Sequence, residues 1–153
     1  MIPVALSALT TTGMLDALQE SGGRAEWSDR IVLLDEYLTR EHEGQPVMTI
    51  DWGIANNLLA LSGGRMELTE ASYAFEGLQS RLNGSPREVL KRSLSGRSTW
   101  FVLHSPAATQ FGNARPRFFS ALNSLGRRAE LVQTLRDPEG RALYEVYAAA
   151  KVR

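Results

Sequence analysis

The chain has 153 residues, and its seventeen basic and seventeen acidic side chains leave no net charge. This length suffices for one domain with a core of its own, and the 43% hydrophobic and 22% charged residues argue against long disordered segments. The balanced charge disfavours nucleic acid as a partner, and the absence of cysteine excludes disulfide bonds, a thiolate nucleophile and cysteine-ligated metal sites.

The amino-terminal segment, residues 1–22, is expected to be separate from a single domain at residues 23–153. Met1 to Leu9 is apolar, but it lacks the basic flank of a signal peptide and is shorter than the roughly 20 residues that a membrane-spanning helix needs. Such a stretch also suits the region just after a membrane helix in a longer protein. Hydrophobic spacing then predicts a modest helix between Thr10 and Gly23.

A stronger helix is predicted from Trp27 to Gly44. Ser28 is placed to cap its first turn, and Trp27 with Val32 to form a hydrophobic staple. Charged residues occupy the side opposite the apolar face, which indicates a solvated surface. The expected buried positions are Ile31, Leu34 and Leu38.

The central stretch of the sequence predicts a buried strand, an acidic turn and a short helix. The strand is Val47–Ile50, the turn contains Asp51, Trp52 and Gly53, and the helix is Ile54–Leu61. A second short strand is expected at residues 65–68, whereas residues 69–83 show no dominant period.

The sequence between Ser85 and Gly126 predicts its helices and strand more clearly. Ser85, Pro86 and Glu88 form a capping box that predicts a helix ending by Gly96. The apolar run at residues 99–104 predicts a strand covered on both faces. Next, Asn113 is expected to cap a helix that ends at Gly126, with an apolar stripe of Phe118, Phe119, Leu122 and Leu125.

The carboxyl-terminal part predicts a β-hairpin. Its strands are residues 130–136 and 142–148, joined by a turn at Asp137–Gly140. The sum of elements indicates an α/β fold with three layers, in which a mainly parallel sheet is flanked by helices and ends in an antiparallel C-terminal hairpin.

Two polar residues follow the predicted central strands, Asp51 after the first and His104 at the end of the second. If these strands are neighbours, both residues lie on one rim, where open α/β sheets place their ligands. Two interpretations are then open. Asp51 and His104 form a general acid/base pair, or Asp51 caps the following helix and His104 is a structural histidine. The candidate ligand-binding residues at this rim are Asp51, Trp52, Asn56, Asn57, His104 and Arg115.

No complete catalytic set accompanies these residues. The sequence has no Gly-x-Ser-x-Gly elbow, no phosphate-binding glycine loop and no histidine cluster for a metal. We therefore assign no catalytic residue, metal ligand or cofactor. An aromatic ring beside amides and a carboxylate suits a sugar, but it equally suits a structural turn in which Trp52 fills the core.

Three stretches of the sequence resemble the soluble carboxyl-terminal domain of membrane glycosyltransferases similar to dolichyl-phosphate-mannose-protein mannosyltransferases. They are Trp27-Ser28-Asp29 with the helix to Leu38, the block from Ile50 to Arg65, and the tail from Phe101 through Asp137-Pro138-Glu139-Gly140-Arg141 to Tyr147. The similarity covers most of the chain from about Gly22 onward, but it contains no catalytic signature.

The resemblance implies a non-catalytic accessory domain on the extracytoplasmic side of a bacterial membrane. Its partners would be the membrane-embedded portion of the parent protein and a carbohydrate or lipid-linked sugar phosphate, since that family uses polyprenyl-phosphate sugars as donors. Two alternatives remain open. One is a free-standing small hydrolase or transferase that uses Asp51 and His104, and the other is a structural interaction module in which Trp52 is buried.

Overall fold

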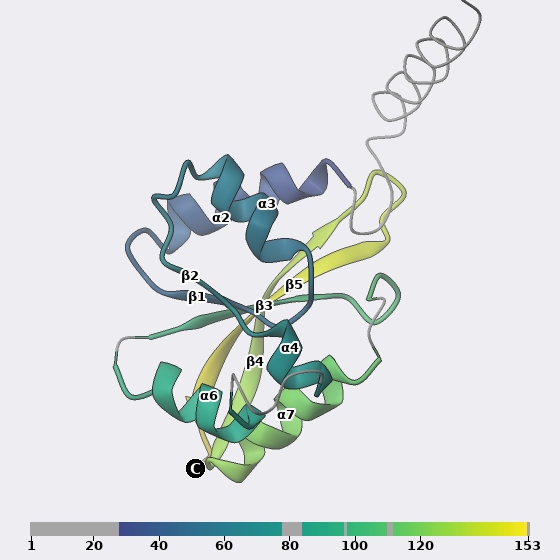
Figure 1. Cartoon of the computed structure of the whole chain (residues 1–153). Helices are drawn as coiled ribbons and strands as arrows, with labels where there is room; N and C mark the ends of the chain where they lie inside the picture. Colours follow the sequence, from purple (N-terminus) through teal and green to yellow (C-terminus); the bar gives the residue numbers. More distant parts are fainter. Residues whose placement is uncertain (1–27, 78–83, 97, 110–111, 153) are drawn as a thin grey trace, which may run out of the picture.

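The computed structural model describes residues 28–77, 84–96, 98–109 and 112–152. The segment at residues 1–22, the helix expected between Thr10 and Gly23, and the staple involving Trp27 lie outside this part. The described strands form one mixed sheet in the order β2-β1-β3-β5-β4 (Figure 1). Their bounds are β1 Val47–Thr49, β2 Leu68–Glu70, β3 Trp100–His104, β4 Arg127–Arg136 and β5 Ala142–Lys151.

The sheet changes direction at β3. Strand β1 pairs in parallel with β2 and with β3, so the condition for a shared rim, that the two central strands are neighbours, is met. Strand β5 then pairs antiparallel with β3 and with β4. The expectation of a mainly parallel sheet is therefore corrected to a mixed one, because the hairpin inserts its second strand next to β3 and the parallel pairings extend over only three residues of β1.

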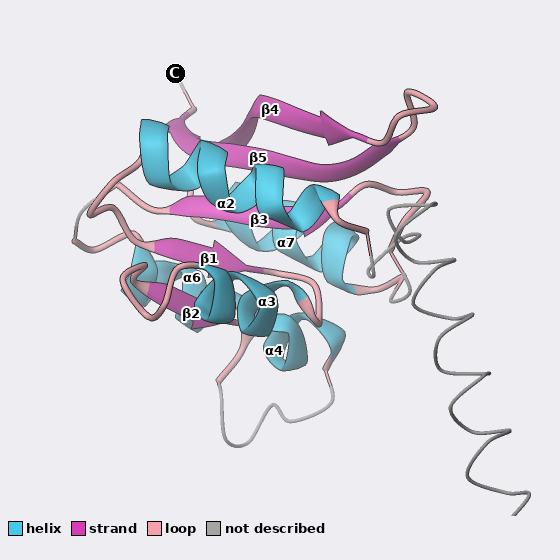
Figure 2. Ribbon diagram, turned by 90° about the horizontal axis from the view of Figure 1, so that it is seen from above, coloured by secondary structure: helices cyan, strands magenta, loops and turns pink. Residues whose placement is uncertain are grey.

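Helices lie on both faces of the sheet (Figures 1 and 2). Helices α2 and α3 lie over one face, and α4, α6 and α7 lie over the other. The helices are α2 Arg30–Glu41, α3 Ile54–Leu61, α4 Ser72–Glu76, α6 Pro86–Ser93 and α7 Ala114–Ser124. None of the helices in the described part of the chain is long and apolar enough to cross a membrane.

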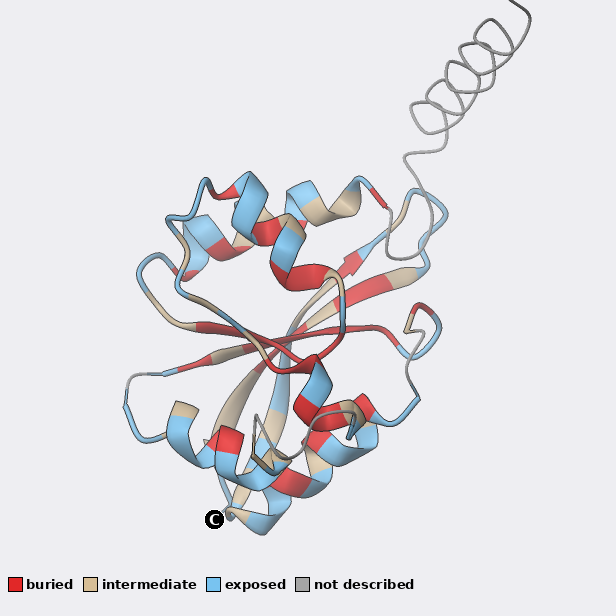
Figure 3. Cartoon of the chain, in the orientation of Figure 1, coloured by how far each residue is buried: buried red, intermediate tan, exposed pale blue. Residues whose placement is uncertain are grey.

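Each face of the sheet has its own hydrophobic cluster, and the central strands between them are buried (Figure 3). The cluster beneath α4, α6 and α7 is rich in aromatic residues: the Phe118 ring lies 5.1 Å from that of Phe101 and 6.0 Å from that of Phe75. The cluster beneath α2 and α3 is mainly aliphatic and includes Leu34 and Leu58. Alternate residues of β1 and β3 contribute to opposite clusters, as the pleat of a strand requires.

The sequence predicts the capping residues at some helix N-termini and not at others. The capping box of α6 is confirmed, with the Ser85 N–H donating to Glu88 and the Glu88 N–H donating to Ser85 Oγ. At α2, Ser28 Oγ accepts from the Arg30 N–H at 3.2 Å. The expected cap of α7 by the Asn113 side chain is wrong: Glu76 of α4 accepts from the Ala114 N–H at 2.7 Å.

Helix α2 ends at a buried histidine. His42 lies in a polar stretch of the sequence, yet only 8% of it is exposed, and its ring stacks on Trp100 with 3.7 Å between centroids. Burial lowers the pKa of His42, so the neutral ring is favoured. The stack joins the end of α2 to the start of β3, where the Trp100 indole donates to Gln45 at 2.6 Å.

Candidate functional site

Asp51 lies two residues after the end of β1 and is 1% exposed. Both of its carboxylate oxygens accept hydrogen bonds from the chain itself: Oδ2 from the His104 N–H at 2.8 Å, and Oδ1 from the Thr109 hydroxyl at 2.9 Å. The expectation that Asp51 caps α3 is therefore wrong. The N-cap of α3 is Gly53, with φ +85° and no side-chain cap. Asp51 joins β1 to the segment that follows β3.

His104 is at the end of β3 and is 4% exposed. Its backbone is bonded on both sides, because its N–H donates to Asp51 and its carbonyl accepts from Arg115 Nη1 at 3.2 Å. The imidazole lies 5.2 Å from the Tyr144 ring. The hydrogen bond that joins Asp51 and His104 at the rim is thus donated by the His104 backbone N–H and accepted by the Asp51 carboxylate.

Arg115, in the first turn of α7, joins the same rim to β5. Its Nη2 donates to Glu145 at 2.5 Å and to the Tyr147 hydroxyl at 2.6 Å, while the guanidinium lies 5.3 Å from the centre of the Phe119 ring. Burial, together with the hydrogen bond to Glu145, raises the pKa of Tyr147 to about 12. Arg115 is therefore engaged in a partly buried network.

The residue after Asp51 is placed quite differently. Trp52 is 41% exposed, so it does not fill the core. Asn56 is exposed on α3, whereas the Asn57 amide donates to the Gly53 carbonyl at 2.9 Å and stabilises the turn. Within the described residues, no hydrogen bond or ion pair joins Trp52 or Asn56 to the other candidates. The structure thus brings together Asp51, His104 and Arg115 and leaves Trp52 and Asn56 at the surface.

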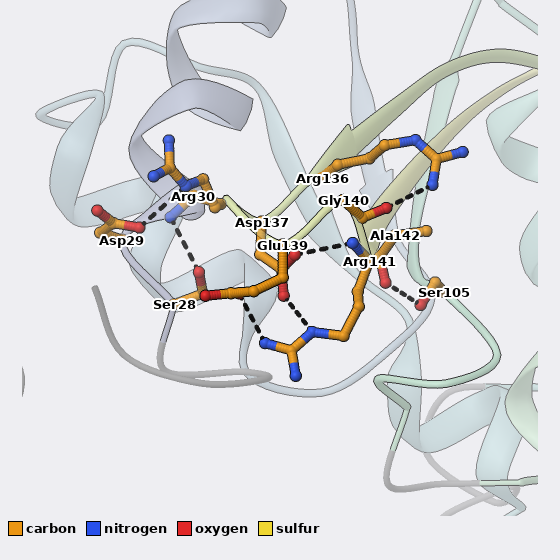
Figure 4. A network of polar contacts seen from close by, with 10 residues as sticks. All are labelled: Ser28, Asp29, Arg30, Ser105, Arg136, Asp137, Glu139, Gly140, Arg141 and Ala142. Carbon is orange, nitrogen blue, oxygen red and sulfur yellow. Dashed lines mark hydrogen bonds and ion pairs between the residues drawn. The ribbon is translucent and has the colours of Figure 1, made fainter. Parts of the chain in front are cut away.

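The end of β3 is also fixed to the hairpin. The Ser105 N–H donates to the Leu143 carbonyl at 2.7 Å, and the Ser105 hydroxyl donates to the Ala142 carbonyl at 2.6 Å (Figure 4). In the adjoining turn, Asp137 accepts from the backbone N–H and the guanidinium of Arg141. These bonds hold the rim from the β5 side, as Asp51 holds it from the β1 side.

Four residues of this region are absent from the predicted set: Thr109, Tyr144, Glu145 and Tyr147. Glu145 and Tyr147 are two residues apart on one strand and therefore point to the same face, which the alternation of the hairpin could have indicated. Thr109 is in a loop and reaches Asp51 only through the fold. Comparison of the chain with family models, with curated proteins and with solved structures gives no match. The site is therefore interpreted from its own geometry.

Within the described ranges, no three His, Cys, Asp or Glu side chains lie together in a way that could hold a metal ion. The described rim presents an exposed indole, an exposed amide on the following helix, and a carboxylate whose oxygens already accept hydrogen bonds. This combination offers a stacking surface beside a rigid turn.

Proposed function

We propose that the chain is a non-catalytic accessory domain of a polyprenyl-phosphate-sugar-dependent membrane glycosyltransferase, with a glycan-binding surface at Trp52. The observation that carries the proposal is the contrast between two adjacent residues. Both oxygens of the Asp51 carboxylate accept hydrogen bonds from the chain itself, whereas the indole of the next residue, Trp52, is exposed. An exposed indole beside a fixed turn, with the exposed Asn56 amide four residues later, suits stacking on a sugar ring and hydrogen bonding to its hydroxyl groups.

The remaining parts of the proposal follow from the sequence resemblance. In it, the domain lies on the extracytoplasmic side and has the membrane-embedded portion of the parent protein as its partner, while its three layers follow from the order of the helices and strands. Transfer of the sugar belongs to that portion, and Trp52 contributes to holding the acceptor or its glycan.

The alternative of a free-standing enzyme that uses Asp51 and His104 has less support. General acid/base catalysis needs side chains within reach of a substrate proton. Both residues are almost fully buried, and both Asp51 oxygens already accept hydrogen bonds. The alternative of an interaction module expected a buried Trp52, and that expectation is wrong, since the indole is exposed.

The test is a titration of the ¹⁵N-labelled chain with mannose and with α-linked manno-oligosaccharides, followed through the indole N–H signals. We expect the Trp52 signal to shift and saturate. The Trp100 signal serves as an internal control, because its indole N–H is bonded to Gln45. Trp27 is assigned by substitution with phenylalanine.

Two variants distinguish specific stacking of the sugar on Trp52 from nonspecific binding to exposed aromatic rings. Trp52→Ala should abolish the saturable shifts, whereas Tyr73→Ala, which removes a similarly exposed aromatic ring next to β2, should leave them unchanged. Absence of a Trp52 shift at sugar concentrations well above millimolar, or equal loss in both variants, would overturn the proposed function.

A further inference from the structure

The helices on the two faces of the sheet differ in charge. Helices α4, α6 and α7, over one face, contain five basic and two acidic residues. Helices α2 and α3, over the other face, contain two basic and three acidic residues (Figure 1). Since the whole chain has no net charge, the charges are separated across the sheet. All five basic residues of the first group are on α6 and α7, so we call the exposed surface of these two helices the basic face.

The acidic residues of the first group cap helices. Glu88 belongs to the capping box of α6, and Glu76 of α4 accepts from the Ala114 N–H at the start of α7. Their negative charges therefore lie at the positive ends of helix dipoles. One of the basic residues, Arg115, is paired with Glu145. The other four are exposed, namely Arg87, Lys91, Arg92 and Arg117.

A groove between α6 and α7 lies in the basic face. It has a volume of about 500 Å³, and its lining includes Arg87 and Arg117. Arg117 Nη1 donates to the Phe75 carbonyl at 3.2 Å, which holds this side chain in place. Three serines also line the groove, namely Ser85, Ser120 and Ser124. Guanidinium and hydroxyl groups are common protein contacts of phosphate oxygens, so the groove suits a phosphate group.

The composition of the basic face distinguishes between partners that carry phosphate or other negative charges. Proteins that bind single-stranded nucleic acid stack its bases on aromatic rings, and protein interfaces have a partly apolar centre. In the described part of the chain, the exposed large apolar and aromatic side chains all lie on elements other than α6 and α7. An anionic lipid surface needs neither, because its headgroups attract basic residues by charge alone.

We propose that the basic face of α6 and α7 binds the surface of an anionic lipid bilayer, with headgroup phosphates in the groove between the helices. In this orientation the carboxylates of α2 lie across the sheet from the lipid, and salt screens their repulsion over about 10 Å at 0.1 M. Trp52 takes no part, since it lies just before α3, the helix over the other face (Figure 1). The inference therefore does not depend on the proposed function.

Co-sedimentation with vesicles, in the absence of sugar, tests the inference. The vesicles contain phosphatidylcholine alone or with about 30% phosphatidylglycerol, in about 0.05 M salt. Each basic residue near an anionic surface adds roughly fivefold in affinity, so four should leave about half of the chain bound near 1 mM accessible lipid. Binding should decrease as salt is added. Equal binding to both kinds of vesicle, or none to the anionic vesicles at about 10 mM lipid, would overturn the inference.

Removal of charge tests the location of the lipid contact. Arg87→Gln combined with Lys91→Gln should weaken vesicle binding about 25-fold, and glutamine preserves helix propensity. Arg30→Gln combined with Arg40→Gln is the matched control, because it lowers the net charge equally, but on α2 across the sheet (Figure 1). The control should change binding by less than about twofold. Equal weakening by both pairs would overturn the assignment to α6 and α7.

The absence of cysteine permits a test of orientation. An environment-sensitive fluorophore attached to Ser120→Cys, at the groove, should brighten and shift to shorter wavelength on anionic vesicles. The same fluorophore on Thr39→Cys, at an exposed position of α2, should not respond. An equal response at both positions, or a response only on α2, would overturn the proposed orientation.

Two competition measurements identify the source of the phosphate. Inorganic phosphate should release the chain from vesicles no more than sodium chloride of equal ionic strength does, and a stronger release would assign the groove to a free phosphate ion instead of a lipid. Duplex DNA at equal phosphate concentration should bind more weakly than the vesicles, and tighter binding to DNA would overturn the choice of lipid. A chain that binds vesicles but shows no Trp52 shift with sugar would refute only the proposed function, and the reverse result would refute only this inference.

Discussion

The two faces of the sheet are constructed differently. Beneath α4, α6 and α7 the core is aromatic, and the polar groups that enter it, Arg115, Glu145 and Tyr147, bond to one another. Beneath α2 and α3 the core is mainly aliphatic, and the hydroxyl of Thr49, which is fully buried, has no hydrogen-bond partner among the described residues. We therefore expect the first face to contribute more to the stability of the fold than the second, whose helices also expose the apolar side chains of Val32, Leu33, Leu59 and Leu61.

The largest difference is expected from truncating the aromatic face. Phe118→Ala should reduce the free energy of unfolding by about 3–5 kcal/mol, because a fully buried ring that contacts four other aromatic rings is lost. Leu58→Ala, its counterpart beneath α3, should cost less, about 2–3 kcal/mol. Urea denaturation measures both. An equal or larger loss for Leu58→Ala would contradict the contrast between the faces.

The next effect is pH-dependent and belongs to Tyr147. Burial and the Glu145 hydrogen bond raise its pKa from 10.0 to about 12 in the folded state, so the folded protein holds this proton more tightly than the unfolded chain. Stability should be unaffected by Tyr147 below pH 10 and should decrease between pH 10 and 12, by roughly 3 kcal/mol in total.

Denaturation at several alkaline pH values, with absorbance titration of the tyrosinates, measures this decrease. Tyr147→Phe is the control, since it retains the ring and removes the titrating hydroxyl. A variant that loses stability over the same pH window as strongly as the wild type would show that another group is responsible.

A smaller loss is expected at the rim between the two faces. Asp51→Ala removes both acceptor oxygens and leaves the buried His104 N–H without its partner, so it should cost about 2 kcal/mol. Thr109→Val removes only one of the two bonds and should cost about 1 kcal/mol. Thermal unfolding of both variants checks this order, and a neutral Asp51→Ala would mean that the carboxylate does not hold the rim.

The smallest effect has the opposite sign. Thr49→Val replaces a buried hydroxyl without a partner by a methyl group of similar shape, so it should stabilise the protein by about 1 kcal/mol. Thr69→Val, at an exposed position of the edge strand β2, should change stability very little. A destabilised Thr49→Val would indicate that this hydroxyl is bonded in solution and that the two faces are more alike than described.

Local signals in the sequence predict those parts of the fold that depend on neighbouring residues. The capping box at Ser85 and the hairpin turn at Asp137 are confirmed, since their partners lie within a few positions. The adjacency of β1 and β3, which the sequence left as a condition, is found in the sheet. The order of the strands beyond β3 depends on pairing between distant segments. No local pattern in the sequence predicts that β5, and not β4, lies next to β3.

In the candidate site, too, the sequence predicts local features and not the contacts between distant segments. Position in the chain predicts that Asp51 and His104 share a rim provided that their strands are neighbours, and the parallel pairing of β1 with β3 meets that condition. It does not predict that Asp51 accepts hydrogen bonds from the His104 backbone and from Thr109, because those partners are far away in sequence. Likewise, Glu76 caps α7 from another helix. Residue type alone could not decide between a buried and an exposed Trp52, since an indole suits both environments.

The Asp51 carboxylate also has a consequence for the order of folding. Its bonds to His104 and Thr109 span 53 and 58 residues, so each closes a long loop whose entropic cost must be met by contacts already present. We therefore expect these bonds to form after β1 and β3 have paired. In the native protein, the hydrogen-exchange rate of the His104 amide should then report how often the carboxyl ends of these two strands separate.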